Sequence, residues 1–163
     1  GTLYNVWDMM VETDTDWTNS RLDIILTSGS FYDEPNYGTN VEPAPNFFTL
    51  VPNLEWDRYA AVPRRHPSLA AFAGEDLLVM DAQNFRASWF DSVTDPAGTY
   101  MIARLTLSLD ASGELTGKSY DVETQGVGVP IEGLEIVDGE IVPEPATLSL
   151  LALGALAMLR RRR

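Results

Sequence analysis

Oxygen-bearing side chains alternate in one short segment near the start of the chain, a pattern typical of calcium-binding loops. The segment reads Asp14-Thr15-Asp16, and carboxylate oxygens are ligands that Ca²⁺ prefers. The segment lacks the glycine and the terminal glutamate of an EF-hand loop. The alternative is a polar turn in which an aspartate accepts hydrogen bonds from its own backbone. Asp14 and Asp16 are therefore candidate calcium ligands, and no other cofactor is indicated.

Aromatic side chains in loops are candidates for binding sugar rings. Trp17, Tyr32 and Tyr37 lie in or beside predicted loops, where an exposed ring could stack on a sugar. We take these three as candidate ligand-binding residues that would face an extracellular polysaccharide. The other tryptophans occupy inward-facing positions of predicted strands, and we expect them in the core: Trp7, Trp56 and Trp89.

Residues suited to catalysis are scarce in this sequence. His66 is the only histidine, in the basic loop Pro63-Arg64-Arg65-His66-Pro67, and one loop histidine gives little support to a catalytic triad or a histidine metal site. No phosphate-binding or nucleophile-elbow motif occurs. Because the chain has 24 acidic residues, pairs of carboxylates suited to glycoside hydrolysis carry no information. We therefore expect a protein that is not an enzyme.

The end of the chain combines a short motif, an apolar run and a basic cluster. Pro143 and Pro145 stop a helix from extending backwards and hold Glu144 in an extended, accessible conformation. Residues 146–159 carry no formal charge, and arginines occupy residues 160–163. A helix over the apolar run would span about 21 Å, less than the roughly 30 Å of a bilayer core. Snorkelling arginines and local thinning of the bilayer can cover the difference. Since positively charged flanks stay in the cytoplasm, the body must lie on the opposite side of the inner membrane.

This arrangement resembles the PEP-CTERM sorting signal of Gram-negative bacteria. In that family an exosortase, a membrane-embedded cysteine transpeptidase, recognises the tail and processes the protein near the Pro-Glu-Pro. The resemblance implies that Pro143, Glu144 and Pro145 are the recognition residues and that exosortase is a partner. It also implies a membrane helix followed by a cytoplasmic basic cluster. The helix residues are Ala146, Leu150, Leu153, Leu156 and Leu159, and the basic cluster is Arg160, Arg161, Arg162 and Arg163.

The destination implied by the resemblance is the cell surface or extracellular matrix, after a transient stay in the inner membrane. The resemblance covers the tail alone and says nothing about the activity of the body. A permanent single-pass anchor and a buried C-terminal helix are the competing interpretations. Because the sequence starts at Gly1 without a recognisable export signal, we expect that such a signal was removed and that Gly1 lies near the start of the mature domain.

Composition limits the partners of the body. The net charge of the chain is −13, and four of its eleven basic residues are the arginines of the tail, so the body is more acidic than the whole. Such a surface repels nucleic acid and favours solubility outside the cell, and we expect no nucleic-acid partner. The chain has no cysteine, which excludes disulfides and thiolate metal sites.

The body reads as eight or nine short strands separated by turns rich in Gly, Pro and Asp. This pattern predicts an antiparallel β-sandwich, jelly-roll or immunoglobulin-like, over residues 1–142, with a small barrel as the alternative. The short hydrophobic helix would follow within residues 143–163. Phe47 to Val51 is predicted to be a strand, and Asp138-Gly139 a two-residue hairpin turn. Residues 101–109 are predicted to point Thr106 and Ser108 into water.

The sequence therefore predicts a non-enzymatic exported protein with a structural or adhesive role at the cell envelope or in the extracellular matrix. The alternative is a carbohydrate- or calcium-binding β-sandwich module at the cell surface.

Overall fold

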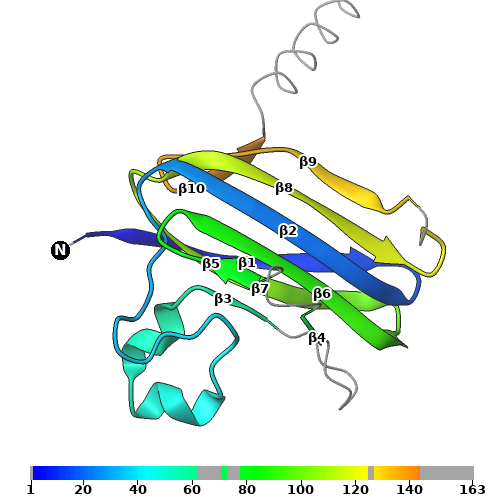
Figure 1. Ribbon diagram of the computed structural model, residues 1–163, viewed down its shortest axis with the longest axis horizontal. Helices are drawn as coiled ribbons and strands as arrows, with labels where there is room; N and C mark the ends of the chain where they lie inside the picture. Colours follow the sequence, from blue (N-terminus) through cyan, green and yellow to red (C-terminus); the bar gives the residue numbers. More distant parts are fainter. Residues whose placement is uncertain (1, 62–70, 73–77, 125–126, 144–163) are drawn as a thin grey trace, which may run out of the picture.

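The computed structural model describes residues 2–61, 71–72, 78–124 and 127–143, which fold into two antiparallel sheets (Figure 1). Sheet A has three strands in the order β1-β7-β3, and sheet B has seven, in the order β10-β9-β8-β2-β6-β4 with β5 also paired to β6. The strands are β1 (Tyr4–Thr13), β2 (Trp17–Ser28), β3 (Tyr59–Ala60), β4 (Ala71–Phe72), β5 (Leu78–Met80), β6 (Asn84–Asp95), β7 (Gly98–Ser108), β8 (Ser112–Asp121), β9 (Val129–Val137) and β10 (Glu140–Pro143).

The core lies between the two sheets because apolar residues alternate along their strands. In sheet B, every second residue is buried from Ser20 to Leu26 in β2 and from Phe85 to Trp89 in β6, and β7 supplies buried residues from sheet A. The buried core residues of these three strands include Leu22, Ile24 and Leu26, then Phe85, Ala87 and Trp89, then Ile102, Ala103, Leu105 and Leu107. The predicted all-β fold of two facing antiparallel sheets is confirmed, and the finer jelly-roll or immunoglobulin-like topology stays a prediction.

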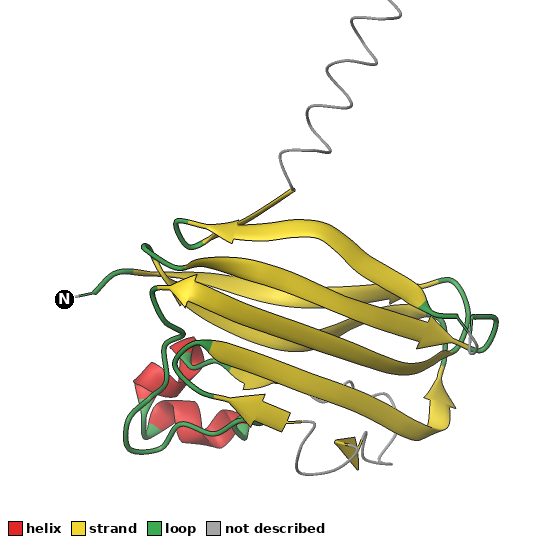
Figure 2. Ribbon diagram, turned by 45° about the horizontal axis from the view of Figure 1, so that its top comes forward, coloured by secondary structure: helices red, strands yellow, loops and turns green. Residues whose placement is uncertain are grey.

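The segment predicted to be a strand from Phe47 to Val51 is instead helical. Its first three residues belong to η1 (Pro45–Thr49), and Leu50 and Val51 lead into a second 3₁₀ helix, η2 (Pro52–Trp56). Each begins with a proline, whose fixed φ suits a helix start and whose missing N–H costs nothing there. Figure 2 shows these short helices together at one corner of the molecule. Trp56, expected in the core, ends η2 with half of its surface exposed.

The outward face of β7 also differs from the prediction. Thr106 and Ser108 are buried rather than solvated, because the chain that leaves β2 runs beside this end of β7. Phe31 forms an isolated bridge with Leu107, and the amide of Tyr32 donates to the carbonyl of Thr106 at 2.8 Å. A connection that looks like a plain loop in sequence therefore extends sheet A and covers its strand.

The predicted Asp138-Gly139 hairpin turn is confirmed. Asp138 and Gly139 have φ of 51° and 73°, the left-handed values that a two-residue type I′ turn needs. The turn joins β9 to β10, with Val137 paired to Glu140 and Leu134 paired to Pro143. Strand β10 therefore ends at the first proline of the Pro-Glu-Pro sequence.

Among the described residues, no helix has the length and apolar character needed to cross a bilayer. Several parts of the chain discussed above lie outside the described residues: the predicted membrane helix, the basic cluster, Glu144, Pro145 and His66.

Candidate functional site

The two sheets are joined at one end by side chains of β1. Asn5 Nδ2 donates to Glu140 Oε1 at 2.8 Å and to the carbonyl of Gly139 at 3.3 Å. Trp7 Nε1 donates to the same carbonyl at 3.1 Å. These bonds fasten the edge strand of sheet A to the β9–β10 hairpin of sheet B.

Further along β1 the sheets separate and leave a cleft. The pairing of β1 with β7 shifts register between Met9 and Met10, and the pairing of β8 with β9 shifts between Leu115 and Gly117. Such bulges bend a strand and increase its twist. The cleft has a volume of about 210 Å³ and is lined by Met10, Val11, Glu12, Thr13, Ser119, Tyr120, Asp121, Val129, Pro130 and Ile131.

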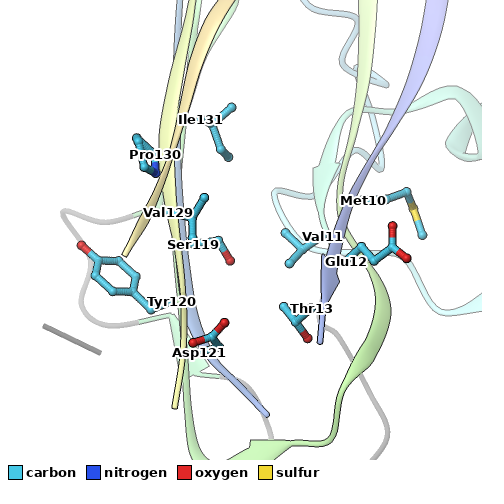
Figure 3. Close-up of a pocket in the computed structure, with 10 residues that line it drawn as sticks. All are labelled: Met10, Val11, Glu12, Thr13, Ser119, Tyr120, Asp121, Val129, Pro130 and Ile131. Carbon is cyan, nitrogen blue, oxygen red and sulfur yellow. The ribbon is translucent and has the colours of Figure 1, made fainter. Parts of the chain in front are cut away.

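Polar side chains lie on both walls of this cleft. Figure 3 shows Val11 and Thr13 on β1 pointing toward β8 and β9, with Ser119 and Asp121 on the facing wall. The hydroxyl of Thr13 is buried and makes no hydrogen bond within the described residues. Ser119 is held by a hydrogen bond between its hydroxyl and that of Ser20 at 2.8 Å.

Asp121 is fixed by the turn that follows β8. Its Oδ1 accepts hydrogen bonds from the side chain and the amide of Thr124, at 2.9 and 2.8 Å, and from the amide of Glu123 at 3.0 Å. These bonds, with Thr124 the main donor, hold the pKa of Asp121 below its usual range. The carboxylate therefore stays ionised beside the cleft over the physiological pH range.

The cleft is small, and only one of the two acids that line it faces inward. Its volume is below the roughly 300–1,000 Å³ of pockets that enclose drug-sized ligands. Glu12, the other acid in the lining, points away from the cleft (Figure 3). Glu12 and Asp121 therefore do not face each other across the cleft as the two carboxylates of a glycosidase do.

The candidate calcium ligands do not converge. Asp14 is exposed, and Asp16 accepts a hydrogen bond from Thr94 at 3.2 Å and a backbone bond from Val122 at 2.9 Å. Within the part of the chain that the structure describes, no three His, Cys, Asp or Glu residues are placed to hold a metal ion. Residues 14–16 form the short connection between β1 and β2, which fits the competing interpretation of a polar turn, and the calcium site stays a prediction.

The three candidate aromatic residues differ in their exposure to solvent. The expectation that Trp17 lies in a loop is wrong: it begins β2 and is completely buried, with its Nε1 donating to Ser20 at 2.9 Å. Tyr32 is half-buried and packs edge-on against Tyr4. Tyr37 is 60% exposed. Of the three, Trp17 is therefore unavailable to a ligand, and Tyr37 is the most accessible.

The loop that carries Tyr37 is organised by buried acids that sequence reasoning missed. Asp57 is fully buried, and its carboxylate accepts from the amides of Glu34 and Thr39 at 3.0 and 3.1 Å. Burial raises the pKa of Asp57, although these backbone bonds oppose the rise. The side chain of Glu34 in turn accepts from the amides of Asn36 and Tyr37. No sequence motif signals the bonds of Asp57, because its partners Glu34 and Thr39 lie 23 and 18 residues away in the chain.

The fold and the tail together define an all-β protein that carries a C-terminal sorting signal. Residues 142–163 match the family model of the PEP-CTERM protein-sorting motif, so the resemblance seen in the sequence is confirmed. This motif marks the chain as an exported protein that exosortase processes and anchors at the cell surface. No curated protein and no solved structure matches the chain.

Proposed function

We propose that the protein is a non-enzymatic structural or adhesive component of the cell envelope or extracellular matrix. The observation that carries this proposal is the PEP-CTERM motif at residues 142–163. The tail would direct a body of residues 1–142 to the outside, while residues 143–163 serve only in sorting. The four arginines at the end would hold the unprocessed protein in the inner membrane with the body outside.

The position of the motif on the fold supports this division. Val142 and Pro143 pair with Glu135 and Leu134 in the edge strand β10. The motif thus begins where the sheet ends, with no long linker between them. Removal of the tail beyond Pro143 would leave every described strand in place.

The lining of the cleft is compatible with a binding role. Asp121 lacks a facing acid there, as described above, so the cleft does not present the paired carboxylates of a glycosidase. The acidic body would remain soluble at the cell surface because like-charged copies repel one another.

The intact mass of the protein from native cells tests the sorting step. We expect the mature protein to lack the arginine-terminated tail, and an exosortase-deficient strain to retain it. Glu144→Ala and Pro145→Ala should also retain the tail. Glu132→Ala is the matched control, because Glu132 is an exposed acid in β9 away from the motif, and it should be processed normally. A full-length mass for the protein in the matrix fraction would contradict the proposal.

A separate measurement tests the structural or adhesive role. A strain that lacks the protein should lose surface attachment or matrix cohesion, and a copy with an intact motif should restore it. Restoration by the Glu144→Ala copy, which should remain unprocessed, would argue against a role that depends on delivery.

The second candidate is a carbohydrate- or calcium-binding module at the cell surface. The observation that favours the carbohydrate version is the cleft with its hydroxyl and carboxylate groups, together with exposed Tyr37 elsewhere on the surface. A glycan array probed with the processed protein tests this version. The calcium version rests on Asp14 and Asp16, and it requires that EDTA lower the unfolding temperature.

A further inference from the structure

We infer that the outer face of sheet B is a binding surface for a carboxylated polysaccharide, held by Arg21, Arg86 and Lys118. The inference rests on the proposed function, since such a polymer would be met outside the cell. Figure 1 shows β8, β2 and β6, which carry these three residues, running side by side in front of sheet A.

The first support is the concentration of positive charge in an acidic protein. The chain has a net charge of −13, and its described residues include five cations. Three of the five lie on this one face. The described cations are Arg21, Arg58, Arg86, Arg104 and Lys118.

Ion pairs within the sheet explain only part of this concentration, because Asp23 pairs with Arg21 and Arg86 and no such pair includes Lys118 within the described residues. Arg21 and Lys118 are direct cross-strand partners in β2 and β8, and like charges directly opposite each other destabilise a sheet. Positions whose side chains point to solvent from a sheet tolerate many polar residues, so folding does not demand two cations here. A ligand of opposite charge would explain why Arg21 and Lys118 face each other.

The second support is the way Asp23 orients the two arginines. Arg21 donates to Asp23 through Nε at 2.5 Å and Nη2 at 3.1 Å, and Arg86 donates through Nε at 2.6 Å. The Nη1 of Arg21 and both Nη groups of Arg86 make no hydrogen bond within the described residues. Their side chains remain 48% and 44% exposed. The free edges of the two guanidinium groups are thus preorganised to hold a carboxylate, which matches their planar geometry.

The same face offers apolar surface for the rings of a polysaccharide. Lys118 Nζ lies 5.8 Å from the centre of the Tyr120 ring. Beside Arg86 is a shallow hollow of about 100 Å³, whose lining includes Ile25 and Val79. These two side chains are 52% and 40% exposed. Separate cations interspersed with apolar patches fit a polymer that alternates carboxylates with the apolar faces of sugars.

Other polyanions fit this face less well. Glu114 and Glu135 are cross-strand partners at the far end of β8 and β9, so the positive charge is confined to part of the sheet. Duplex DNA and anionic membranes present dense charge over a wide area, and they would be repelled by the acidic body around the patch. A carboxylated polysaccharide carries sparser charge, so it can contact the three cations without lying against the acidic surface around them.

Binding of the full-length protein in a nonionic detergent to polygalacturonate tests the inference. We expect saturable binding that weakens as NaCl is added, because salt screens exposed charges, and no binding to neutral dextran. Arg86→Gln and Lys118→Gln should each raise the dissociation constant roughly tenfold, the loss expected for one charge-assisted hydrogen bond. Arg104→Gln is the matched control, since Arg104 pairs with Asp8 on sheet A at 2.7 Å, and it should bind as the wild type does.

Three results would overturn the inference: no binding to polygalacturonate, binding that both variants on sheet B leave unchanged, or stronger binding to dextran sulfate, duplex DNA or anionic vesicles. Thermal unfolding of each variant shows whether it is folded. A processed protein that remains in the matrix but does not bind polygalacturonate would remove this inference and leave the proposed function standing.

Discussion

The indole Nε1 of Trp7 donates a hydrogen bond to the carbonyl oxygen of Gly139 at 3.1 Å. This bond connects the first strand of the chain to the hairpin that immediately precedes the sorting motif. The two residues belong to different sheets, so the bond also closes one end of the space between them. The anchoring of β10, and with it the start of the motif, therefore depends on the N-terminal strand.

Replacing Trp7 with phenylalanine should destabilise the protein. The substitution keeps an aromatic ring but removes the N–H donor, and we expect a loss of about 1 kcal/mol in the free energy of unfolding, the typical contribution of one hydrogen bond. Chemical denaturation measures the loss. Trp56→Phe is the matched control, because Trp56 is half exposed and should change stability by less than about 0.5 kcal/mol. Equal effects of the two substitutions would show that the bond to Gly139 contributes nothing.

Gly139 should not tolerate a side chain. Its φ is +73°, and an added Cβ would lie 2.7 Å from the carbonyl oxygen of Ser108. Gly139→Ala should therefore cost about 1–3 kcal/mol, the range for a residue held in an unfavourable backbone region. Gly98→Ala provides the control, since the nearest atom to its Cβ would be 3.5 Å away. If a thermal unfolding scan gives the two variants the same unfolding temperature, the prediction is wrong.

Asp23 should add stability that is lost in acid. Desolvation raises the pKa of this carboxyl, but the hydrogen bonds and charges of Arg21 and Arg86 outweigh desolvation and hold it below the usual value. Because the folded protein binds this proton more weakly than the unfolded chain does, the contribution is complete above the unfolded pKa of about 3.9 and disappears as pH falls through the folded pKa.

The comparison of wild type with Asp23→Asn measures this contribution. We expect a difference in unfolding free energy of up to about 1 kcal/mol per pair near neutral pH, since the arginines are nearly half exposed. The difference should shrink in acid and in high salt. A difference that is constant from neutral pH to strong acid would rule out the ion pairs as its source.

Asp57 should be required for the loop that carries Tyr37. Asp57→Ala would leave the amides of Glu34 and Thr39 without their acceptor. The Glu34 bond is buried, and a buried unsatisfied group costs about 1–3 kcal/mol. Limited proteolysis should then detect faster cleavage near residue 37. Asp110→Ala changes an exposed acid in the turn after β7 and should leave both stability and cleavage unchanged. Protection of the loop in the Asp57 variant would show that Asp57 does not organise it.

Local patterns explain why parts of the fold could be predicted. The alternation of Phe85, Ala87 and Trp89 indicates a half-buried strand because side chains on a strand point alternately to its two faces, and all three are buried. The Asp138-Gly139 pair indicates a hairpin because few other residues accept two left-handed φ values in succession. Each of these signals needs only neighbouring residues.

Errors arose where distant parts of the chain decide the environment. Trp17 follows two aspartates and resembles a loop residue, yet β2 extends to it and pairs it with both Asp95 and Asp121. Thr106 and Ser108 look solvated until the chain after β2 lies beside them. Tyr120 lines the cleft but was not among the predicted site residues. The one signal for it was its place on the solvent face of a predicted strand.

The sequence by itself determined the sorting signal of this protein, since a proline motif, an apolar run and terminal arginines act through their order along the chain. It also indicated most of the strands, because short-range alternation marks them, although the segment from Phe47 to Thr49 is helical. Only the tertiary structure decided which residues meet: the cleft between β1 and β8–β9, the bond from Trp7 to Gly139, and the cations gathered around Asp23. Those contacts join residues separated by many positions, and their formation depends on sheet order and register, which no local pattern encodes.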